Sequence, residues 1–352
     1  MESDSLTARN TTILSVSSLD PGARLTEERI GLLGMGAYLP AKVMTNADWT
    51  RRVDTTDEWI LTRTGIAERR FAADDESTAD LAVHAARAAL ADAGVDPEAL
   101  DEIVIATDTP EVYTPDTAAF VQHRLGARSI PAYDLGGSGC AGFLQALDVA
   151  RSRAHEAGRC ILVVGVEVLS RVMSLTDRTT CVLFGDGAGA VVLGRGERAA
   201  EILVVVTGTD GSRAGILGIE TGGTRRPFSL EGNPSGRLEI TMQGQRVFKE
   251  AVRRMSAAAL EALEKAGLDL SDVALLVPHQ ANARIIDAVG KALKLPSEKV
   301  FVNVRDFGNT GSASVPIALA QAHREGRIAT GDHVLLVSFG AGFHWGAALI
   351  RF

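Results

Sequence analysis

The sequence predicts an α/β protein made of two βα-rich halves that follow the same order of elements. Apolar strands rich in Val, Ile and Leu alternate with helical patterns along most of the chain. Several of these strands run into glycine-rich turns. In addition, three segments recur at a separation of roughly 172 residues, which is in the range of a domain duplication. They are Ala93-Gly94-Val95-Asp96 with Ala266-Gly267-Leu268-Asp269, residues 103–106 with 275–278, and residues 161–164 with 334–337.

Each expected element has its own signal in the sequence. The helix expected over residues 77–93 starts at Ser77 and stops at Gly94, and the helix after Cys140 stops at Gly158. Gly34-Met35-Gly36 and the segment from Phe184 to Gly189 are expected to be turns. The other expected elements are strands at residues 30–33, 103–106, 130–135, 160–166, 275–278 and 334–337, and a helix near residues 118–125.

The chain is expected to divide into three parts. We interpret residues 1–28 as a mobile N-terminal extension, because they are polar and begin with an acidic segment unlike a signal peptide. Residues 29–200 form the predicted first half, which carries Cys140. Residues 201–352 form the predicted second half.

Composition narrows the class of protein. Hydrophobic residues make up 46% of the chain and charged residues 23%, as in ordinary globular proteins. A net charge of −8 argues against a general binder of nucleic acid or membrane surfaces. No apolar run approaches the ~18 residues of a membrane span. Cys140, Cys160 and Cys181 are odd in number and lack a Cys-x-x-Cys spacing, which predicts free thiols in a reducing cytosol.

The clearest chemical signal is the segment from Tyr133 to Gly142. A short apolar strand leads into three glycines and then Cys140. Apolar residues then follow at helical spacing, namely Phe143, Leu147, Ala150 and Ala154. A thiol at such a strand-to-helix turn lies at a helix N-terminus, where backbone N–H groups stabilise a thiolate or a developing oxyanion. We therefore interpret Cys140 as a nucleophile, although a small buried thiol in a tight turn would give the same local pattern.

Three segments of the second half also carry chemical groups. His279 follows a buried strand, Asn309 lies in a glycine-flanked turn before a helix, and residues 338–346 form a third turn rich in backbone donors. Taken singly, the histidine could be a satisfied core residue and the asparagine a helix N-cap. Because ligands gather at the carboxyl ends of strands, we expect the Cys140 turn and the Asn309 turn to face one another in one site.

Together these segments resemble the thiolase-like condensing enzymes, and most closely the β-ketoacyl-acyl-carrier-protein synthase III family. The resemblance runs from about Ile30 to Phe352. It implies a thiolase-like fold, in which two duplicated halves pack as a layered α-β-α-β-α core. The Cys-His-Asn set separates this group from Cys-His-His synthases and from thiolases, which use a second cysteine. The motifs, in matching order, are Thr56-Asp57-Glu58-Trp59, Arg63-Thr64-Gly65-Ile66, Cys140-Ala141-Gly142-Phe143, Phe184-Gly185-Asp186-Gly187-Ala188-Gly189, Pro278-His279-Gln280-Ala281-Asn282, Gly308-Asn309-Thr310 and Trp345-Gly346.

The resemblance implies a decarboxylative Claisen condensation that starts fatty-acid biosynthesis. Cys140 would take the acyl group of an acyl-coenzyme A as a thioester, and malonyl-acyl-carrier protein would lose carbon dioxide and attack it. His279 and Asn309 would stabilise the charge that develops on the malonyl thioester. The backbone N–H groups of Cys140 and Ala341 would bind the acyl oxygen. No cofactor and no metal are implied, since acyl-coenzyme A and the malonyl carrier are substrates.

The same resemblance implies binding residues and partners. Coenzyme A would contact Thr55, Trp59, Arg63, Arg178 and Asn282. Thr114 and Phe339 would shape the acyl pocket. Lys249, Arg284 and Lys291 would meet the acidic acyl-carrier protein, although charges on a solvated helix face would look the same. The enzyme would be a cytoplasmic homodimer that binds neither nucleic acid nor membrane.

The sequence departs from the family pattern at several positions. Gly137-Ser138-Gly139 precedes the cysteine where many relatives carry alanines. His344 stands where threonine is frequent, and Thr114 stands where a bulky residue gates the acyl pocket. These departures leave the acyl donor open.

Two other functions stay open on the sequence. A related condensing enzyme of polyketide or other natural-product assembly would keep the same three polar residues and use a different acyl donor or acceptor. A cysteine hydrolase or acyltransferase would release or pass on the acyl group without forming a carbon–carbon bond, but Asn309 beside His279 favours condensation over hydrolysis.

Overall fold

The computed structural model describes residues 29–197, 199–229, 231 and 236–352. The predicted extension over residues 1–28 lies outside this part of the chain. The described residues form one nine-stranded sheet, two small two-stranded sheets and the helices that cover them. The order of strands in the large sheet is β11-β12-β13-β8-β1-β7-β6-β4-β5.

Six of the strands, β1, β4, β5, β6, β11 and β12, overlap the predicted apolar runs, and the others do not. Their bounds are β1 Ile30–Tyr38, β2 Lys42–Thr45, β3 Glu68–Phe71, β4 Glu102–Ala106, β5 Ala132–Leu135, β6 Ile161–Val168, β7 Asp186–Arg195, β8 Ala200–Thr209, β9 Leu217–Ile219, β10 Ile240–Met242, β11 Val273–Pro278, β12 His333–Gly340 and β13 His344–Arg351.

The helices begin and end at the residues that punctuate the sequence. Ser77 and Asp80 form a capping box at the start of α3, and Gly94 ends that helix in the left-handed conformation. The α-helices are α1 Asn46–Thr50, α2 Asp57–Thr64, α3 Thr78–Ala93, α4 Thr117–Leu125, α5 Gly142–Ala157, α6 Gly244–Ala266, α7 Ala283–Ala292, α8 Val304–Phe307 and α9 Ser314–Arg324. The 3-10 helices are η1 Pro97–Ala99, η2 Gly139–Ala141, η3 Leu169–Arg171, η4 Gly211–Ile216, η5 Leu270–Asp272, η6 Ser297–Lys299 and η7 Gly311–Ala313.

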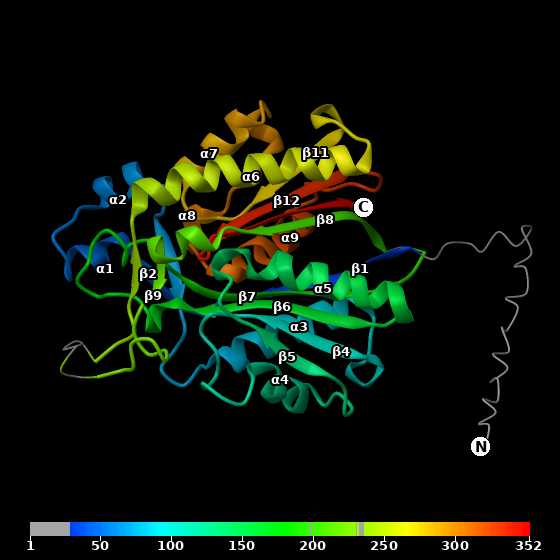
Figure 1. The fold of residues 1–352 in the computed structure, drawn as a ribbon, viewed down its shortest axis with the longest axis horizontal. Coiled ribbons are helices and arrows are strands. Elements are labelled where there is room, and N and C mark those ends of the chain that lie inside the picture. Colours follow the sequence, from blue (N-terminus) through cyan, green and yellow to red (C-terminus); the bar gives the residue numbers. More distant parts are fainter. Residues whose placement is uncertain (1–28, 198, 230, 232–235) are drawn as a thin grey trace, which may run out of the picture.

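Helices and sheet alternate in five layers, as Figure 1 shows. Helices α3 and α4 cover the outer face of β1, β7, β6 and β4, while α6 covers the outer face of β13, β12 and β8. Helices α5 and α9 lie between these two parts of the sheet and contact strands of both. This arrangement confirms the predicted α-β-α-β-α core.

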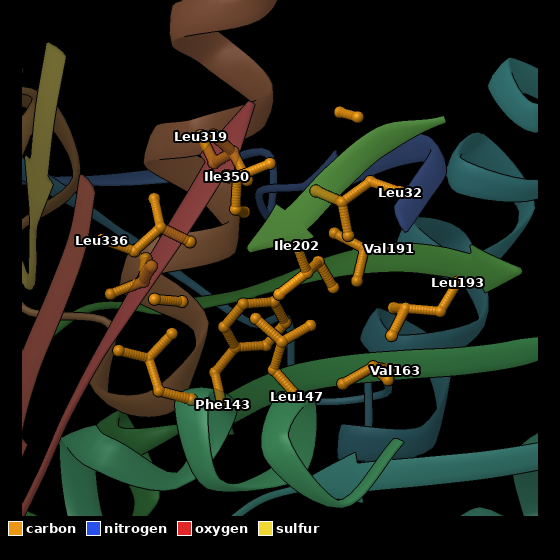
Figure 2. Close-up of a cluster of buried hydrophobic side chains, with 14 of the residues drawn as sticks. Leu32, Phe143, Leu147, Val163, Val191, Leu193, Ile202, Leu319, Leu336 and Ile350 are labelled. Carbon is orange, nitrogen blue, oxygen red and sulfur yellow. The ribbon is translucent and has the colours of Figure 1, made fainter. Parts of the chain in front are cut away.

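The central layer is held by one apolar cluster that joins the two parts of the sheet. Phe143 and Leu147 of α5 are buried together with Leu319 of α9. Figure 2 shows these side chains among residues of β1, β6, β7, β8, β12 and β13. Burying a side chain of this size stabilises the fold by about 1.5–3 kcal/mol. The helical face predicted after Cys140 is therefore the one that packs into the centre of the molecule.

The two parts of the sheet have mirrored strand orders. From the middle outward, one part runs β1, β7, β6, β4, and the other runs β8, β13, β12, β11. They meet through a short antiparallel pairing of β1 and β8, which joins Gly31 to Glu201 and Leu32 to Ala200. The strand pairs β4–β6 and β11–β12 are parallel, so the carboxyl ends of the strands in each pair lie at one edge. The exact division of the chain at residue 200 stays a prediction.

Two predicted turns are wrong, and both errors involve glycines that lie in strands. Strand β1 continues through Gly34 and Gly36, and β7 already begins at Asp186. A Cβ at Gly34 would lie 2.3 Å from the backbone nitrogen of Ala93 in α3. A Cβ at Gly189 would lie 2.7 Å from the backbone nitrogen of Ile317 in α9. These glycines therefore allow helices to approach the sheet closely, which the sequence pattern does not distinguish from a turn.

Candidate active site

A cavity of about 1450 Å³ opens at the edge where the strands of both parts of the sheet end. It is lined by residues from segments far apart in the sequence, among them Cys140, His279, Asn309, Phe339 and Ala341. Every candidate residue for the chemistry of the site therefore faces the same space, although the three side chains are contributed by three different loops.

Cys140 lies in the 3-10 helix η2, directly before helix α5. The glycines that precede it are needed for the turn, because Gly137 and Gly139 have φ values of 79° and 54°. The thiol is half-buried and its Sγ lies 3.9 Å from Oδ1 of Asn309. Burial raises the pKa of the Cys140 thiol, and the nearby carboxyl groups of Glu167 and Asp108 raise it further. The thiolate must therefore be stabilised by donors at the moment of reaction.

His279 follows strand β11 and is 3% exposed. Its backbone N–H donates to the carbonyl of Val337, and its Nδ1 lies 2.5 Å from the hydroxyl of Ser314. Burial lowers the pKa of His279 to about 3, so the ring is neutral at physiological pH. The Ser314 hydroxyl oxygen also accepts the backbone N–H of Gln280 at 3.2 Å. This arrangement favours the tautomer in which Ser314 donates to Nδ1 and Nε2 carries the proton.

Asn309 is fixed on both its backbone and its side chain. Its N–H donates to the carbonyl of Leu183 at 2.8 Å, and its carbonyl accepts the N–H of Gly185 at 3.0 Å. Its Oδ1 accepts the N–H of Gly311 at 2.9 Å as well as the Cys140 thiol. With Oδ1 engaged as an acceptor, the amide nitrogen is the group left to donate into the cavity.

The turn between β12 and β13 packs directly on the Cys140 loop. A Cβ at Gly340 would lie 2.4 Å from the backbone nitrogen of Cys140, and one at Gly139 would lie 2.4 Å from that of Ala341. The proposed oxyanion donors, the N–H groups of Cys140 and Ala341, thus belong to two loops in backbone contact. Phe339 is 3% exposed, lines the cavity and stacks on Phe343 with 4.6 Å between ring centroids.

His344 lies beside this site, within a chain of hydrogen bonds that the sequence did not predict. Its Nδ1 is 3.0 Å from Nε2 of Gln145 and 2.8 Å from the hydroxyl of Thr209. Gln145 in turn accepts the hydroxyl of Ser138 in the Cys140 loop. Burial lowers the pKa of His344, while the negative charge of Asp108 opposes that shift. The departure at His344 therefore connects β13 to the loop that carries the cysteine.

The predicted coenzyme A residues differ in whether they line the cavity. Trp59, Arg63 and Asn282 line it, and Thr55 and Arg178 do not. The guanidinium groups of Arg63 and Arg178 lie 5.6 and 5.2 Å from the centre of the Trp59 ring. Arg178 also donates to the backbone carbonyl of Asp54. Thr55 does not line the cavity, but its buried hydroxyl has no hydrogen-bond partner among the described residues. Asn282 lines the cavity and caps helix α7 through a bond from the N–H of Ile285.

Thr114 does not itself line the cavity of the single chain. It is exposed, whereas Val112, Tyr113 and Pro115 on either side of it are lining residues. Thr114 thus lies in a loop whose neighbouring residues line the cavity, and its role in the acyl pocket stays a prediction.

The three predicted carrier-protein residues are exposed and lie on two helices. Lys249 is near the start of α6 and Arg284 is near the start of α7, where it lines the cavity mouth and lies 5.9 Å from the centre of the Phe248 ring. Lys291 is at the other end of α7 and forms an ion pair with Asp287. Lys249 and Arg284 therefore lie at the helix ends nearest the cavity, and Lys291 does not.

The site contains two carboxyl groups that were not predicted from the sequence. Asp108 follows β4 and Glu167 lies in β6, and both line the cavity beside Cys140. One signal could have indicated them, since a charged residue inside or just after an otherwise apolar strand is costly unless it has a function. Among the described residues, no three or more His, Cys, Asp or Glu side chains are grouped so as to hold a metal ion. No helix in that part of the chain is long and apolar enough to cross a membrane.

Comparison with known proteins gives a consistent result. Residues 133–211 match the family model for 3-oxoacyl-[acyl-carrier-protein] synthase III, and residues 263–352 match the model for its C-terminal part. The chain is 48% identical over 323 residues to the β-ketoacyl-[acyl-carrier-protein] synthase III of Caldanaerobacter subterraneus subsp. tengcongensis, with 91% of this chain and 97% of that protein aligned.

Solved structures show the same relationship. The 3-oxoacyl-[acyl-carrier-protein] synthase III of Aquifex aeolicus superposes with a TM-score of 0.85 at 44% identity, covering 92% of this chain and 100% of that one. A priming β-ketosynthase from a polyketide biosynthetic pathway superposes with a TM-score of 0.84 at 40% identity, covering 94% and 99%. The chain therefore belongs to the β-ketoacyl-acyl-carrier-protein synthase III family of condensing acyltransferases, as its Cys-His-Asn motifs predicted.

Proposed function

We propose that this protein condenses an acyl-coenzyme A with malonyl-acyl-carrier protein to give a β-ketoacyl-acyl-carrier protein, coenzyme A and carbon dioxide. The observation that carries the proposal is the meeting of Cys140, a neutral His279 and Asn309 at one cavity. Relatives at 48% and 44% identity that bear the name of this synthase support it. The reaction is the first condensation of fatty-acid biosynthesis.

In the first half-reaction, Cys140 accepts the acyl group. Its sulfur forms a bond to the thioester carbon, the bond from that carbon to the coenzyme A sulfur breaks, and the thiol proton passes to the departing coenzyme A. A thiolate suits this exchange because it is both a good nucleophile and a good leaving group. The N–H groups of Cys140 and Ala341 bind the oxyanion, and Phe339 excludes water from the acyl group.

In the second half-reaction, the malonyl carboxylate leaves as carbon dioxide. The electron pair of the broken carbon–carbon bond moves onto the thioester, where Nε2–H of His279 and the amide of Asn309 donate to the oxygen. The resulting carbanion attacks the acyl carbon, the bond from that carbon to the Cys140 sulfur breaks, and the released thiolate takes a proton from solvent. A neutral histidine suits this role, since it has a proton to donate without first binding one from solution.

Coenzyme A and the acyl-carrier protein bind at the surface around the cavity. Coenzyme A enters past Trp59 and Arg63, with Thr55, Arg178 and Asn282 as further contacts, and the acyl-carrier protein binds beside Lys249 and Arg284. Lys291 contributes less, because Asp287 already neutralises it. We further propose a cytoplasmic homodimer, in which the partner subunit completes the acyl pocket beside Thr114.

The test is an assay of both half-reactions. Wild-type protein incubated with acyl-coenzyme A should gain one acyl mass on the peptide that contains Cys140. Addition of malonyl-acyl-carrier protein should then release carbon dioxide and give a product whose mass is that of the β-ketoacyl carrier. Acyl mass on Cys160 or Cys181, or release of free acid in place of a condensed product, would refute the proposal.

A second candidate function has one observation in its favour. The priming β-ketosynthase of a polyketide pathway aligns with almost the whole chain at 40% identity. In that case the chemistry of Cys140, His279 and Asn309 is unchanged, but the acyl donor or the carrier protein belongs to another pathway. A panel of acyl-coenzyme A donors, with both fatty-acid and polyketide carrier proteins, would separate the two functions by kcat/KM.

A further inference from the structure

Two carboxyl groups lie against the Cys140 site with only N–H and O–H groups as their recorded hydrogen-bond partners. Asp108 follows strand β4, and Glu167 lies on the adjacent strand β6, where it is 1% exposed. The backbone N–H of Asp108 donates to both oxygens of Glu167 at 3.2 Å. Neither acid has a role in the condensation described above, so their position beside the nucleophile calls for an explanation.

Asp108 accepts hydrogen bonds from the loop that carries Cys140. Its Oδ1 accepts the backbone N–H of Gly137 at 2.6 Å, and the backbone N–H of Gly139 also donates to its carboxylate. Both glycines have positive φ values, so these bonds fix the part of the loop that aims the N–H and sulfur of Cys140. Hydrogen bonds from N–H groups to a carboxylate are roughly twice as strong as those between neutral groups.

Glu167 contacts the loop that carries Asn309. Its carboxyl oxygens lie 2.8 Å from the hydroxyl of Ser312 and 2.7 Å from that of Thr109, both within hydrogen-bond distance. It also packs against Gly311, where a Cβ would lie 2.7 Å from Cγ of Glu167. Because the N–H of Gly311 binds Oδ1 of Asn309, any displacement of Glu167 displaces the catalytic amide.

The chemistry of the partners decides which acid carries a proton. The charge of Asp108 raises the pKa of Glu167, so ionisation of one acid disfavours ionisation of the other. The N–H groups of Gly137 and Gly139 favour the charged form of Asp108, because hydrogen bonds to a carboxylate are stronger than those to a neutral acid. Glu167 accepts one N–H, that of Asp108, and its other partners are hydroxyl groups. The Ser312 hydroxyl has one proton, which it can give to the carbonyl of Ala106, so its oxygen can accept a hydrogen bond from Glu167 and protonated Glu167 keeps its hydrogen bonds.

We propose that Asp108, as a carboxylate, and Glu167, as a carboxylic acid, form a positioning pair that ties the loop of Cys140 to the loop of Asn309. The pair acts through other residues and does not touch the substrate. The inference rests on the proposed roles of Cys140 and Asn309.

The pair has a defined dependence on pH. Burial, and then the charge of Asp108, raises the pKa of Glu167 to about 8. Above that pH, Glu167 ionises beside the Asp108 carboxylate, and repulsion between the two separates the loops. The other titratable groups that face the pair are Cys140 and, from β13, His344. His344 is neutral at this pH, because burial lowers its pKa. We therefore expect acyl transfer to Cys140 to decline as the pH rises through about 8.

Matched substitutions separate the two acids. Glu167→Gln mimics the protonated acid, so acylation of Cys140 at pH 7 should stay within about threefold of wild type and the alkaline decline should disappear. Asp108→Asn removes the charge that strengthens both N–H bonds and replaces one acceptor oxygen by an NH₂ group, so kcat for acylation should fall by about 10- to 100-fold with little change in KM. The readout is the acyl mass on the Cys140 peptide, measured against time from pH 6 to 9.5.

A reactivity assay distinguishes positioning from simple damage to the fold. The charge of Asp108 raises the pKa of Cys140, so Asp108→Asn should be alkylated by iodoacetamide faster than wild type at pH 7 while it transfers acyl groups more slowly. Damage that exposes the thiol would also speed alkylation, so the comparison is made only if Asp108→Asn keeps the urea unfolding midpoint of the wild type. Asp186→Asn is the control, because Asp186 is also buried and also accepts backbone N–H groups, but from Ala72 and Ser170. It should keep the alkaline decline.

Two outcomes would overturn the proposal. One is a Glu167→Gln variant that loses as much acylation at pH 7 as Asp108→Asn. The other is a wild-type profile without a decline near pH 8 that Glu167→Gln removes. Failure of the proposed function would look different, because acyl mass would then be absent from Cys140 in the wild type as well.

Discussion

The Cys140 turn and the Ser312 turn have the same local structure, but only the Cys140 side chain faces the cavity. Each lies in a 3-10 helix that leads into an α-helix, η2 into α5 and η7 into α9. Each begins with a glycine of positive φ, 54° at Gly139 and 58° at Gly311. Cys140 faces the cavity, whereas Ser312 is 1% exposed and its hydroxyl is hydrogen-bonded to the carbonyl of Ala106 and to the carboxyl group of Glu167.

The difference shows that the backbone of the turn does not by itself make a nucleophile. In the first half the turn places a thiol in a cavity where donors from the second half meet it. In the second half the same turn buries a hydroxyl, which helps to hold the Asn309 loop. The loops that follow β4 and β11 differ in length. Residues 107–116 connect β4 to α4, whereas only residues 279–282 connect β11 to α7. The longer loop contributes Val112, Tyr113 and Pro115 to the cavity lining, and the shorter one carries His279.

The largest expected effect comes from giving the Cys140 turn the hydroxyl side chain that the Ser312 turn has. Cys140→Ser should lower the rate of acyl transfer from coenzyme A by at least about 10³-fold, because a serine hydroxyl is neither acidic enough to ionise nor a comparable leaving group. The measurement is acyl incorporation by mass spectrometry. Cys181→Ala is the matched control, since that thiol is fully buried and does not line the cavity, and it should retain acylation. Normal acylation of Cys140→Ser would contradict the assignment.

The second effect tests the donors that the second half contributes. His279→Ala and Asn309→Ala should keep much of the acylation of Cys140 but lose decarboxylation of malonyl-acyl-carrier protein by ~10²–10³-fold, which is the usual effect of losing one preorganised donor. Carbon dioxide release from the malonyl carrier provides the measurement. If both variants decarboxylated at near wild-type rates, these side chains would have no part in that step.

Much of the fold and of the site could be predicted from the sequence. The helix ends at Gly94 and Gly158 could be predicted from the residues nearby, since a positive φ at the C-cap favours glycine whatever surrounds it. The helical face of Phe143 and Leu147 could be predicted in the same way, because the spacing of apolar residues selects the buried side. The candidate catalytic residues were identified through family motifs, which carry tertiary information that the pattern of one chain lacks.

The parts that could not be predicted depend on contacts between distant segments. Gly34 and Gly189 looked like turn residues, but the reason for each glycine is a helix that lies against the strand in the folded protein. Asp108 and Glu167 are 59 residues apart, and nothing local to either indicates that they share a hydrogen bond. Likewise, the link from His344 through Gln145 to Ser138 exists only once β13 lies beside the Cys140 loop.

A smaller effect is expected at the Ser312 turn. Ser312→Ala leaves the buried carbonyl of Ala106 and an oxygen of Glu167 without this hydrogen-bond partner, which should lower the free energy of unfolding by about 1–3 kcal/mol. Urea denaturation measures the change. The informative partner is Ser312→Cys, which places a thiol on both turns. Because position 312 does not open on the cavity, we expect one acyl mass per chain, on Cys140, and a second acyl group would show that the two turns are equally accessible.

The smallest effect concerns the long loop after β4, which has no equal in the second half. Thr114 lies between the lining residues Tyr113 and Pro115, and it is small where the family has a bulky gate. We expect donors longer than acetyl, such as branched or medium-chain acyl-coenzyme A, to react at least comparably with acetyl-coenzyme A. One methylene in an apolar pocket changes the free energy of the transition state by roughly 1–3 kcal/mol, so Thr114→Phe should shift preference toward acetyl by about tenfold.

Tyr113→Ala is the matched variant for this loop, because Tyr113 is the neighbour that could close the pocket in place of residue 114. If Thr114 sets the limit, Tyr113→Ala should leave the order of donors unchanged while Thr114→Phe alters it. The ratio of kcat/KM for acetyl and longer donors measures both variants. A wild-type enzyme strictly specific for acetyl, broadened only by Tyr113→Ala, would assign the gate to Tyr113 and remove the role proposed for Thr114.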